Sequence, residues 1–316
     1  MELVSLGCTR LRVSRVCFGA LTIGPLQKDI PLDEGAGIII RALERGVNFI
    51  DTAASYRTYA YIASALSRWK RDDIVIASKS HAYSQEEMRA DVERCLRELG
   101  RDYVDIFLLH EQESRLTLKG HRPALEFLLR ARDRGLVRAV GISSHTVEAV
   151  DAAADMEEIE IIHPMINKTG IGIKDGTRDD MLHAIKKAHS RGKGIYAMKP
   201  FGGGHLISQA KSALSWVLSQ KCIHSVAVGM GSKEEVDVNT AWAEGKQVDP
   251  ELEKRLASKK RALTVADWCV GCGSCVHRCR HGALEIKEGR AGVNMEKCVL
   301  CGYCAAVCPD FCIKVY

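Results

Sequence analysis

The sequence contains the segment CVGCGSCVHRC at residues 269–279 and the segment CVLCGYCAAVC at residues 298–308. Both follow the spacing C-x2-C-x2-C-x3-C, and together they hold eight of the 13 cysteines of the chain. Each segment places three thiolates on one tight loop and a fourth thiolate a turn later. This arrangement suits a cubane with four iron corners better than a single tetrahedral zinc ion.

The two segments match the cysteine spacing of bacterial two-cluster proteins, and that arrangement implies how their cysteines are shared. In the bacterial two-cluster arrangement, the fourth cysteine of each segment binds the other cluster. The sequence therefore predicts two [4Fe-4S] clusters, one held by Cys269, Cys272, Cys275 and Cys308, the other by Cys298, Cys301, Cys304 and Cys279. A pair of zinc knuckles is the alternative, but zinc sites usually use two separated C-x-x-C pairs.

An internal repeat extends this similarity, because residues 279–286 align with residues 308–315. From about residue 265 to residue 316, the chain resembles a bacterial ferredoxin with two [4Fe-4S] clusters. Arg280 departs from the resemblance, which implies a proline there like Pro309. Cys312 takes the place that Ala283 has in the first half, so we interpret it as a small packed residue.

Length and composition define the remaining part of the chain. The sequence has 316 residues and is 46% hydrophobic, enough for one large and one small domain. Without the ferredoxin-like tail, about 265 residues remain, close to the ~250 that are typical of a (β/α)8 barrel. We predict a barrel over residues 1–245, a linker helix over 246–264 and the ferredoxin-like domain over 265–316. The basic run near residue 260 is interpreted as a solvated helix face or, alternatively, a docking patch for an acidic electron carrier.

Charge and hydropathy exclude several classes of protein. The formal net charge is +5, and the basic residues alternate with acidic ones, so binding to nucleic acid is not expected. No stretch approaches 18 apolar residues, and the N-terminus lacks the pattern of a signal peptide. We therefore expect a cytoplasmic protein without a membrane span, and the need of cluster ligands to stay reduced as thiolates agrees with that compartment. The scattered Cys8, Cys17, Cys95 and Cys222 are expected to be buried small hydrophobes.

Eight units of a β-branched run followed by a helical pattern occupy residues 16–244. The expected strands are 16–20, 47–51, 74–79, 104–110, 137–143, 159–167, 194–199 and 225–229, and the clearest helices are 85–99 and 179–191. Near-continuous apolar runs are typical of parallel strands buried on both faces. This alternation predicts an α/β fold, a closed TIM barrel. A doubly wound sheet is the alternative, but no G-x-G-x-x-G follows any strand.

Polar residues end three neighbouring strands of the predicted barrel. These are Asp51, Lys79 and His110, and Tyr56 follows Asp51 on the same loop. In such a barrel the carboxyl ends of the strands surround one mouth, so the four side chains should converge. We expect Lys79 to lower the pKa of Tyr56, Asp51 to hold Lys79, and His110 to orient a carbonyl. Singly, each residue also fits a structural role; together they favour proton transfer with Tyr56 as the general acid.

The segments around these residues carry a second resemblance. DTAASY at residues 51–56, ASK at 77–79, LLH at 108–110 and GISSH at 141–145 are similar to the signatures of the aldo-keto reductase family. The similarity covers roughly residues 1–245. It implies a (β/α)8 barrel that moves hydride between NAD(P)H and a carbonyl or alcohol, with the Asp, Tyr, Lys, His tetrad at Asp51, Tyr56, Lys79 and His110.

The same resemblance implies a set of cofactor contacts. The nicotinamide end would lie near Ser143, Ser144 and Asn167, and the pyrophosphate and adenosine would follow the seventh and eighth strands, where glycines let backbone N–H groups approach phosphate. The full set is Ser143, Ser144, Asn167, Met198, Lys199, Pro200, Gly202, Gly229, Gly231, Ser232, Lys233, Glu235 and Asn239.

Two departures from the family pattern affect the cofactor. Met198 stands where the family often stacks an aromatic ring on nicotinamide. Glu235 stands where many NADP-dependent members have a basic residue, which would favour NAD. Glu235 also fits a capping box with Ser232. The choice between NAD and NADP therefore stays open.

The two halves differ in how they carry electrons, because a nicotinamide gives hydride while a cubane accepts one electron at a time. The clusters could exchange electrons with a quinone-like substrate, serve a redox partner protein, or support a structural lid. We expect the tail to dock over or beside the barrel mouth. The leading predicted function is an oxidoreductase that acts on a small carbonyl or alcohol. The alternative is an electron-transfer protein whose barrel binds a partner or ligand. An elimination reaction beside a carbonyl is a distant third.

Overall fold

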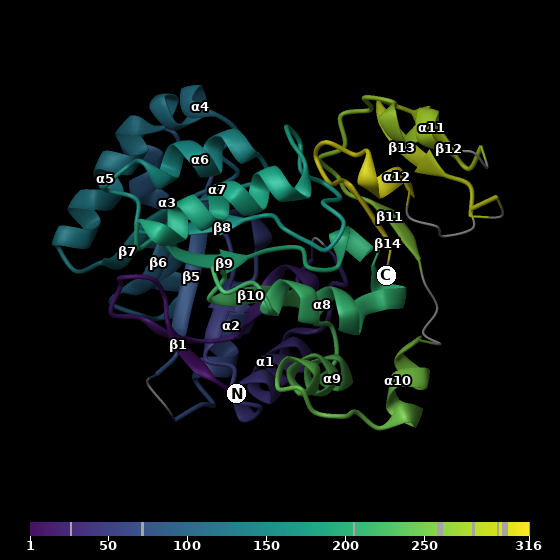
Figure 1. Cartoon of the computed structure of the whole chain (residues 1–316), viewed down its shortest axis with the longest axis horizontal. Helices are drawn as coiled ribbons and strands as arrows, with labels where there is room; N and C mark the ends of the chain where they lie inside the picture. Colours follow the sequence, from purple (N-terminus) through teal and green to yellow (C-terminus); the bar gives the residue numbers. More distant parts are fainter. Residues whose placement is uncertain are drawn as a thin grey trace.

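The computed structural model describes residues 1–25, 27–70, 73–204, 206–257, 262–279, 282–295, 297–298 and 303–315. Eight parallel strands close into a barrel in the order β10-β3-β4-β5-β6-β7-β8-β9, with helices packed around them (Figure 1). The strands are β3 (Val16–Gly19), β4 (Phe49–Asp51), β5 (Val75–Ser80), β6 (Val104–Leu109), β7 (Val137–Ser144), β8 (Ile161–Pro164), β9 (Gly194–Ala197) and β10 (Ser225–Gly229). The predicted barrel is confirmed, and the doubly wound alternative is wrong.

Two predicted strands end at least two residues before their predicted carboxyl ends. β8 ends at Pro164 rather than at residue 167, and beyond it an isolated bridge joins Met165 to Met198. β9 ends at Ala197, two residues before Lys199, whose φ of 56° turns the chain away from the strand direction. The residues after these two strand ends therefore belong to the loops at this side of the barrel mouth.

The strands are buried on both faces, as their continuous apolar runs predicted. An inner core fills the barrel with residues such as Phe49, Ile106 and Tyr196. An outer core lies between the strands and the helices and includes Ile50 and Phe107. A filled interior is typical of this barrel, so the space for ligands lies at the mouth, at the carboxyl ends of the strands.

The helices around the barrel start and stop at ordinary signals. α3 begins after Ser84, whose side chain accepts a hydrogen bond from the amide of Glu87 at 3.2 Å, and ends at Gly100 with φ 64°. The set is α1 (Leu32–Glu44), α2 (Tyr59–Leu66), α3 (Gln85–Leu99), α4 (Arg115–Gly120), α5 (Arg122–Asp133), α6 (Val147–Ala154), α7 (Arg178–Ser190), α8 (Ala210–Leu218) and α9 (Lys233–Ala243).

A short hairpin closes the end of the barrel opposite the mouth. It consists of β1 (Leu3–Ser5) and β2 (Arg12–Ser14), which pair antiparallel. Leu6, Leu11 and Val13 of this segment join the inner core. The hairpin therefore seals the floor of the barrel and leaves only the mouth open to ligands.

The C-terminal domain has its own small core and follows the internal repeat. α11 (Ser274–Arg278) and β12 (Leu284–Lys287) of the first half correspond to α12 (Tyr303–Ala306) and β14 (Ile313–Val315) of the second. β12 pairs with β13 (Arg290–Val293), and β14 pairs with β11 (Leu263–Val265). This domain packs beside η3 (Gly202–Gly204) of the barrel. It lies to one side of the barrel (Figure 1).

The linker and the scattered cysteines can be compared with their predictions. A helix, α10 (Pro250–Ala257), lies in the predicted linker, and residues 258–261 lie outside the described residues, as does Arg280. Cys17, Cys95 and Cys222 are buried as expected. Cys8 is exposed, so that prediction is wrong: it sits on the turn between β1 and β2. Within the described part of the chain, no helix has the length and apolar character needed to cross a membrane.

Gly141 offers a test of the barrel packing. It lies in β7 between β6 and β8, and a Cβ added there would lie 2.0 Å from the carbonyl oxygen of Ile161. Because a backbone atom cannot move aside cheaply, we expect Gly141→Ala to lower the free energy of unfolding by about 1–3 kcal/mol or more. Gly120→Ala, where no atom lies within 4 Å of the added Cβ, should change it by less than about 0.5 kcal/mol. Urea unfolding followed by circular dichroism measures both; equal midpoints would contradict this view of the packing.

Candidate active site and cluster site

The four residues of the predicted tetrad meet at the mouth of the barrel. Asp51 ends β4, Lys79 lies in β5, His110 follows β6, and Tyr56 ends η2 (Ala54–Tyr56). The Nζ of Lys79 donates to Oδ2 of Asp51 at 2.8 Å and to the carbonyl oxygen of Thr52 at 2.7 Å. The same Nζ lies 4.7 Å from the ring centroid of Tyr56. Strand order therefore brings the four side chains together.

His110 faces the ring of Tyr56. The two ring centroids are 5.7 Å apart in an edge-on arrangement, and the ring of His81 stacks on that of His110 with centroids 4.1 Å apart. Burial, reinforced by the charge of Lys79, holds the pKa of His110 well below its usual value. Its Nδ1 is buried without a hydrogen-bond partner among the described residues. His110 is thus a neutral imidazole with unused hydrogen-bonding capacity beside Tyr56.

The electrostatics of Tyr56 differ from the prediction. Burial raises the pKa of Tyr56 to about 12, although Lys79 acts in the opposite direction. Burial also disfavours the charge of Lys79, but Asp51 and Tyr56 together raise the pKa of Lys79 above its usual value. The expected lowering of the pKa of Tyr56 is therefore wrong, because desolvation of the phenolate outweighs the neighbouring charge. Tyr56 remains a protonated phenol and Lys79 a cation near neutral pH.

A second layer supports Asp51 that the sequence did not suggest. The hydroxyl of Tyr196 in β9 donates to Oδ1 of Asp51 at 3.0 Å. His163 of β8 stacks on Tyr196 with centroids 3.8 Å apart, and its Nε2 lies 3.8 Å from the same carboxylate oxygen. In the sequence, the signal for this support is the position of Tyr196, an aromatic residue with a polar hydroxyl on a strand of the barrel. Asp51 is thus fixed by Lys79 on one oxygen and by Tyr196 on the other.

The residues expected at the nicotinamide end lie at the rim of the mouth but are bonded to their own loops. The Oγ of Ser143 accepts from the amide of Glu111 at 2.8 Å. The Oγ of Ser144 accepts from the amide of Thr146 at 2.9 Å. Asn167 holds the loop that follows it, since its Oδ1 accepts from the amide of residue 171 at 3.2 Å. Their contact with a nucleotide stays a prediction.

The loop after β10 is organised around Glu235. Its Oε2 accepts from the amide of Gly231 at 2.8 Å, and its Oε1 lies 3.4 Å from the Nζ of Lys28. The Oγ of Ser232 accepts from the amide of Glu235 at 3.2 Å and begins α9, which is one half of the predicted capping box. The carboxylate of Glu235 accepts instead from the amide of Gly231. Asn239 donates to the carbonyl oxygen of Glu235 at 2.7 Å. Lys28, from the loop after β3, was not foreseen and places a cation beside this acid.

The remaining predicted cofactor residues lie at the ends of β9 and β10 and on the segments that follow these strands. Gly229 ends β10, Lys233 begins α9, Gly202 begins η3, and Met198 and Pro200 are buried around Lys199. The Nζ of Lys199 lies 3.2 Å from the ring centroid of Phe311, a residue of the C-terminal domain. Burial lowers the pKa of Lys199 to about 7.

The contact of Phe311 with Lys199 bears on the position of the tail. Phe311 also lies 4.7 Å from the ring of His145, at the end of β7. The prediction that the tail docks beside the mouth is therefore confirmed. Its effect on substrate access stays a prediction.

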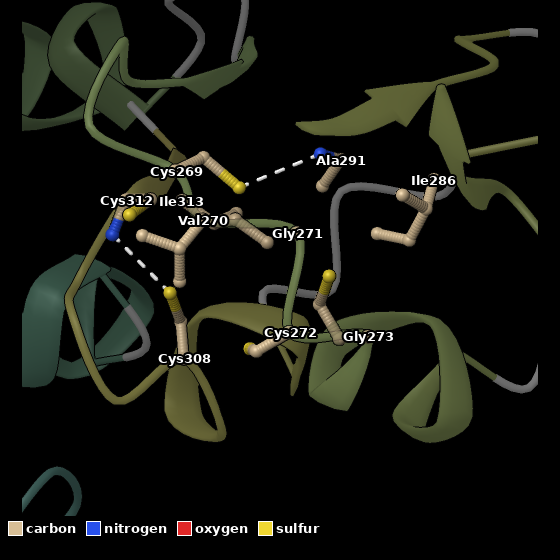
Figure 2. A pocket seen from close by; sticks show the side chains of 11 residues that line it. Cys269, Val270, Gly271, Cys272, Gly273, Ile286, Ala291, Cys308, Cys312 and Ile313 are labelled. Carbon is tan, nitrogen blue, oxygen red and sulfur yellow. Dashed lines mark hydrogen bonds between the residues drawn. The ribbon is translucent and has the colours of Figure 1, made fainter. Parts of the chain in front are cut away.

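The cysteines of the first predicted set surround one pocket (Figure 2). Its volume, including its opening, is about 300 Å³, and Cys269, Cys272, Cys275 and Cys308 all line it. Backbone amides already point at the sulfurs: Ala291 donates to Cys269 at 3.4 Å and Cys312 to Cys308 at 3.2 Å. Amide donors to ligand sulfurs are typical of iron–sulfur sites.

The second set is described in part. Cys279, Cys298 and Cys304 belong to the core of the small domain, the amide of Ala283 donates to Cys279 at 3.4 Å, and Cys301 lies outside the described residues. Cys312 is buried and packed, as its position in the repeat predicted. Among the described residues, no three His, Cys, Asp or Glu side chains converge as ligands of a single metal ion would; the four sulfurs of the first set surround a wider space.

Comparison with known proteins agrees with this arrangement. The family model of the aldo/keto reductases matches residues 15–211. The chain belongs to the aldo/keto reductase family. Residues 262–309 match a 4Fe-4S dicluster domain, so this oxidoreductase joins an aldo-keto reductase barrel to a domain for two iron–sulfur clusters.

Individual relatives cover the barrel. An L-galactose dehydrogenase of Arabidopsis thaliana is 26% identical over 282 residues, which covers 76% of this chain and 88% of the relative. Among solved structures, PA4992 of Pseudomonas aeruginosa, assigned to the aldo-keto reductases, gives a TM-score of 0.67 at 26% identity over 77% of this chain and 95% of that chain. The aldo-keto reductase AKR11C1 of Bacillus halodurans, at 21% identity and a TM-score of 0.64, covers 81% of this chain and 95% of that chain and shares the fold.

Cys308 and Cys312 form a matched pair for testing the ligand set. Both are buried and lie in the same loop, but only Cys308 is a predicted ligand. We expect Cys308→Ala to reduce the iron content of anaerobically reconstituted protein from about eight to about four atoms per chain. Cys312→Ala should retain both clusters. Iron analysis and EPR of the reduced protein measure this, and full iron content in the Cys308 variant would refute the assignment.

Proposed function

We propose that this protein is an NAD(P)-dependent oxidoreductase that moves hydride between a nicotinamide and a carbonyl or alcohol, with Tyr56 as general acid and base. The observation that carries the proposal is the buried contact of Lys79 with Asp51 at 2.8 Å beneath the ring of Tyr56. The family membership and the similarity to an L-galactose dehydrogenase support an alcohol or carbonyl substrate. A bound nicotinamide nucleotide would supply or accept the hydride.

The four tetrad residues divide the proton chemistry between them. In carbonyl reduction, Tyr56 donates its hydroxyl proton to the oxygen of the substrate as that oxygen gains negative charge. The ammonium of Lys79 stabilises the phenolate left behind, and Asp51 keeps Lys79 charged and in place. A neutral His110 can donate a ring N–H to the same substrate oxygen and thereby orient it. Alcohol oxidation reverses these steps, with the phenolate of Tyr56 as the base.

The C-terminal domain adds one-electron chemistry to this proposal. We assign the two predicted cysteine sets to two [4Fe-4S] clusters that exchange electrons with a quinone-like substrate or with a redox partner protein. The alternative function is an iron–sulfur electron-transfer protein whose barrel binds a ligand. The presence of Phe311 in the mouth and the loop contacts of Ser144 and Asn167 favour it.

One experiment distinguishes the two functions. The leading proposal expects oxidation of NADH or NADPH that depends on an added carbonyl, while the alternative expects reduction of the clusters by a protein donor without such dependence. Anaerobic titration with each nucleotide, followed by visible absorbance and EPR, separates them.

Tyr56→Phe removes the hydroxyl and keeps the ring against Lys79 and His110. We expect carbonyl turnover to fall by about 10²–10⁴-fold, the usual contribution of general acid catalysis, with little change in nucleotide affinity. Steady-state kinetics and nucleotide titration measure the two effects. Tyr103→Phe, which changes a tyrosine that packs against Arg101 and Arg138 away from the tetrad, is the control. Retained turnover in the Tyr56 variant would remove Tyr56 from this role.

The pKa of about 12 for Tyr56 predicts different pH profiles for carbonyl reduction and alcohol oxidation. Reduction needs the protonated phenol, so its kcat/KM should stay flat from pH 6 to pH 10. Oxidation needs the phenolate, so its kcat/KM should rise about tenfold per pH unit over the same range. A reduction profile that falls with a midpoint near pH 8 would show that another group is the acid.

A further inference from the structure

Phe311 of the C-terminal domain is seated in a socket at the barrel mouth. Its ring lies against Lys199 and His145. A Cβ added at Gly172 would lie 3.1 Å from the ring and 2.9 Å from the sulfur of Met165. Gly172 also has φ 91°, a conformation that favours glycine. The loop after β8 therefore leaves room for this ring, and any side chain at residue 172 would displace it.

The same ring is tied closely to Cys308. The amide of Phe311 donates to the carbonyl oxygen of Cys308 at 3.2 Å. The amide of the next residue, Cys312, donates to the sulfur of Cys308, also at 3.2 Å. Phe311 thus contacts the barrel mouth, and the next residue, Cys312, donates a hydrogen bond to a predicted cluster ligand. Displacement of the ring would disturb that hydrogen bond.

Lys199 brings charge to this contact. Its ammonium group lies over the face of Phe311, and within the described part of the chain it makes no ion pair with a carboxylate. Phe311 follows Cys308 by three residues, so Lys199 lies against the segment that carries this predicted cluster ligand. A cation in this position stabilises added negative charge on either side: an electron on a cluster at Cys308, or an anionic group of a ligand in the mouth.

We propose that Lys199 and Phe311 couple the cluster held by Cys308 to the barrel mouth, so that reduction of this cluster and binding of an anionic ligand in the mouth oppose each other. The inference rests on the proposed assignment of Cys308 as a cluster ligand and takes a nicotinamide nucleotide as its ligand. Because coupling is reciprocal, the oxidation state of the cluster sets the affinity of the mouth, and an occupied mouth lowers the potential of the cluster.

The first test measures cluster potentials without any ligand. EPR-monitored redox titrations compare the full-length, reconstituted wild type with Lys199→Met and Gly172→Ala at pH 6, where an amine of pKa about 7 is charged. We expect Lys199→Met to lower the potential of one cluster by about 59 mV, which corresponds to a tenfold weaker affinity for the electron. Gly172→Ala should lower the potential of the same cluster by loosening the amide donor to Cys308.

Two matched variants control this test. Gly135→Ala changes a glycine of φ 77° with no atom within 4 Å of the added Cβ, and Lys187→Met removes a lysine paired with Asp151 and Asp155 on the outer helices. Both should leave the potentials unchanged. Iron and sulfide analysis comes first, so that only fully loaded proteins are compared. Unchanged potentials in both Lys199→Met and Gly172→Ala would overturn the proposal.

The second test measures the reciprocal effect on binding. The probe is the tetrahydro analogue of NADPH, which carries no transferable hydride, titrated into oxidised and dithionite-reduced protein. We expect about tenfold weaker binding to the reduced protein and loss of this difference in Lys199→Met. Equal affinities in the two wild-type states would overturn the coupling. Absence of binding in both states would contradict the nicotinamide nucleotide of the proposed function rather than the coupling. The cluster potentials of the first test would then show whether Lys199 and Phe311 influence the cluster.

Discussion

The ammonium group of Lys79, buried at the mouth of the barrel, is the constraint on which the rest of the site depends. A buried charge is tolerated only when it is paired and hydrogen-bonded, and removing one partner of such a pair typically costs about 3–5 kcal/mol. Asp51 and the carbonyl oxygen of Thr52 meet this requirement for Lys79. Tyr196 then fixes the free oxygen of Asp51. The barrel interior is thereby organised around one cation, and the ring of Tyr56 lies directly against it.

This constraint also explains the acid strength of Tyr56. The site excludes water enough to raise the pKa of the phenol, while Lys79 limits the rise and remains ready to stabilise the phenolate during turnover. Burial and charge thus oppose each other in the resting state. A group that is protonated at rest and whose conjugate base is stabilised in place is suited to donate a proton in carbonyl reduction.

The C-terminal domain completes the mouth rather than extending away from it. Phe311 fills a socket that exists because Gly172 has no side chain, and the amide of the next residue, Cys312, donates to the sulfur of Cys308. Two domains with different electron chemistry therefore meet at the barrel mouth, where Phe311 contacts Lys199 and where β14 and α12 pack near η3. In the proposed coupling, the cation of Lys199 serves both sides, which gives a physical route between them that neither domain has alone.

The sequence by itself determined the barrel, the repeat of the cluster domain and the convergence of the tetrad. Each of these rests on local order: strand length, cysteine spacing, and polar residues at successive strand ends that must meet at one mouth. The support of Asp51 by Tyr196, the pairing of Lys28 with Glu235 and the insertion of Phe311 beside Lys199 were decided only by the tertiary structure. These contacts join residues 145, 207 and 112 positions apart. No local pattern encodes such distances, and the net pKa of Tyr56 likewise depends on burial that only packing creates.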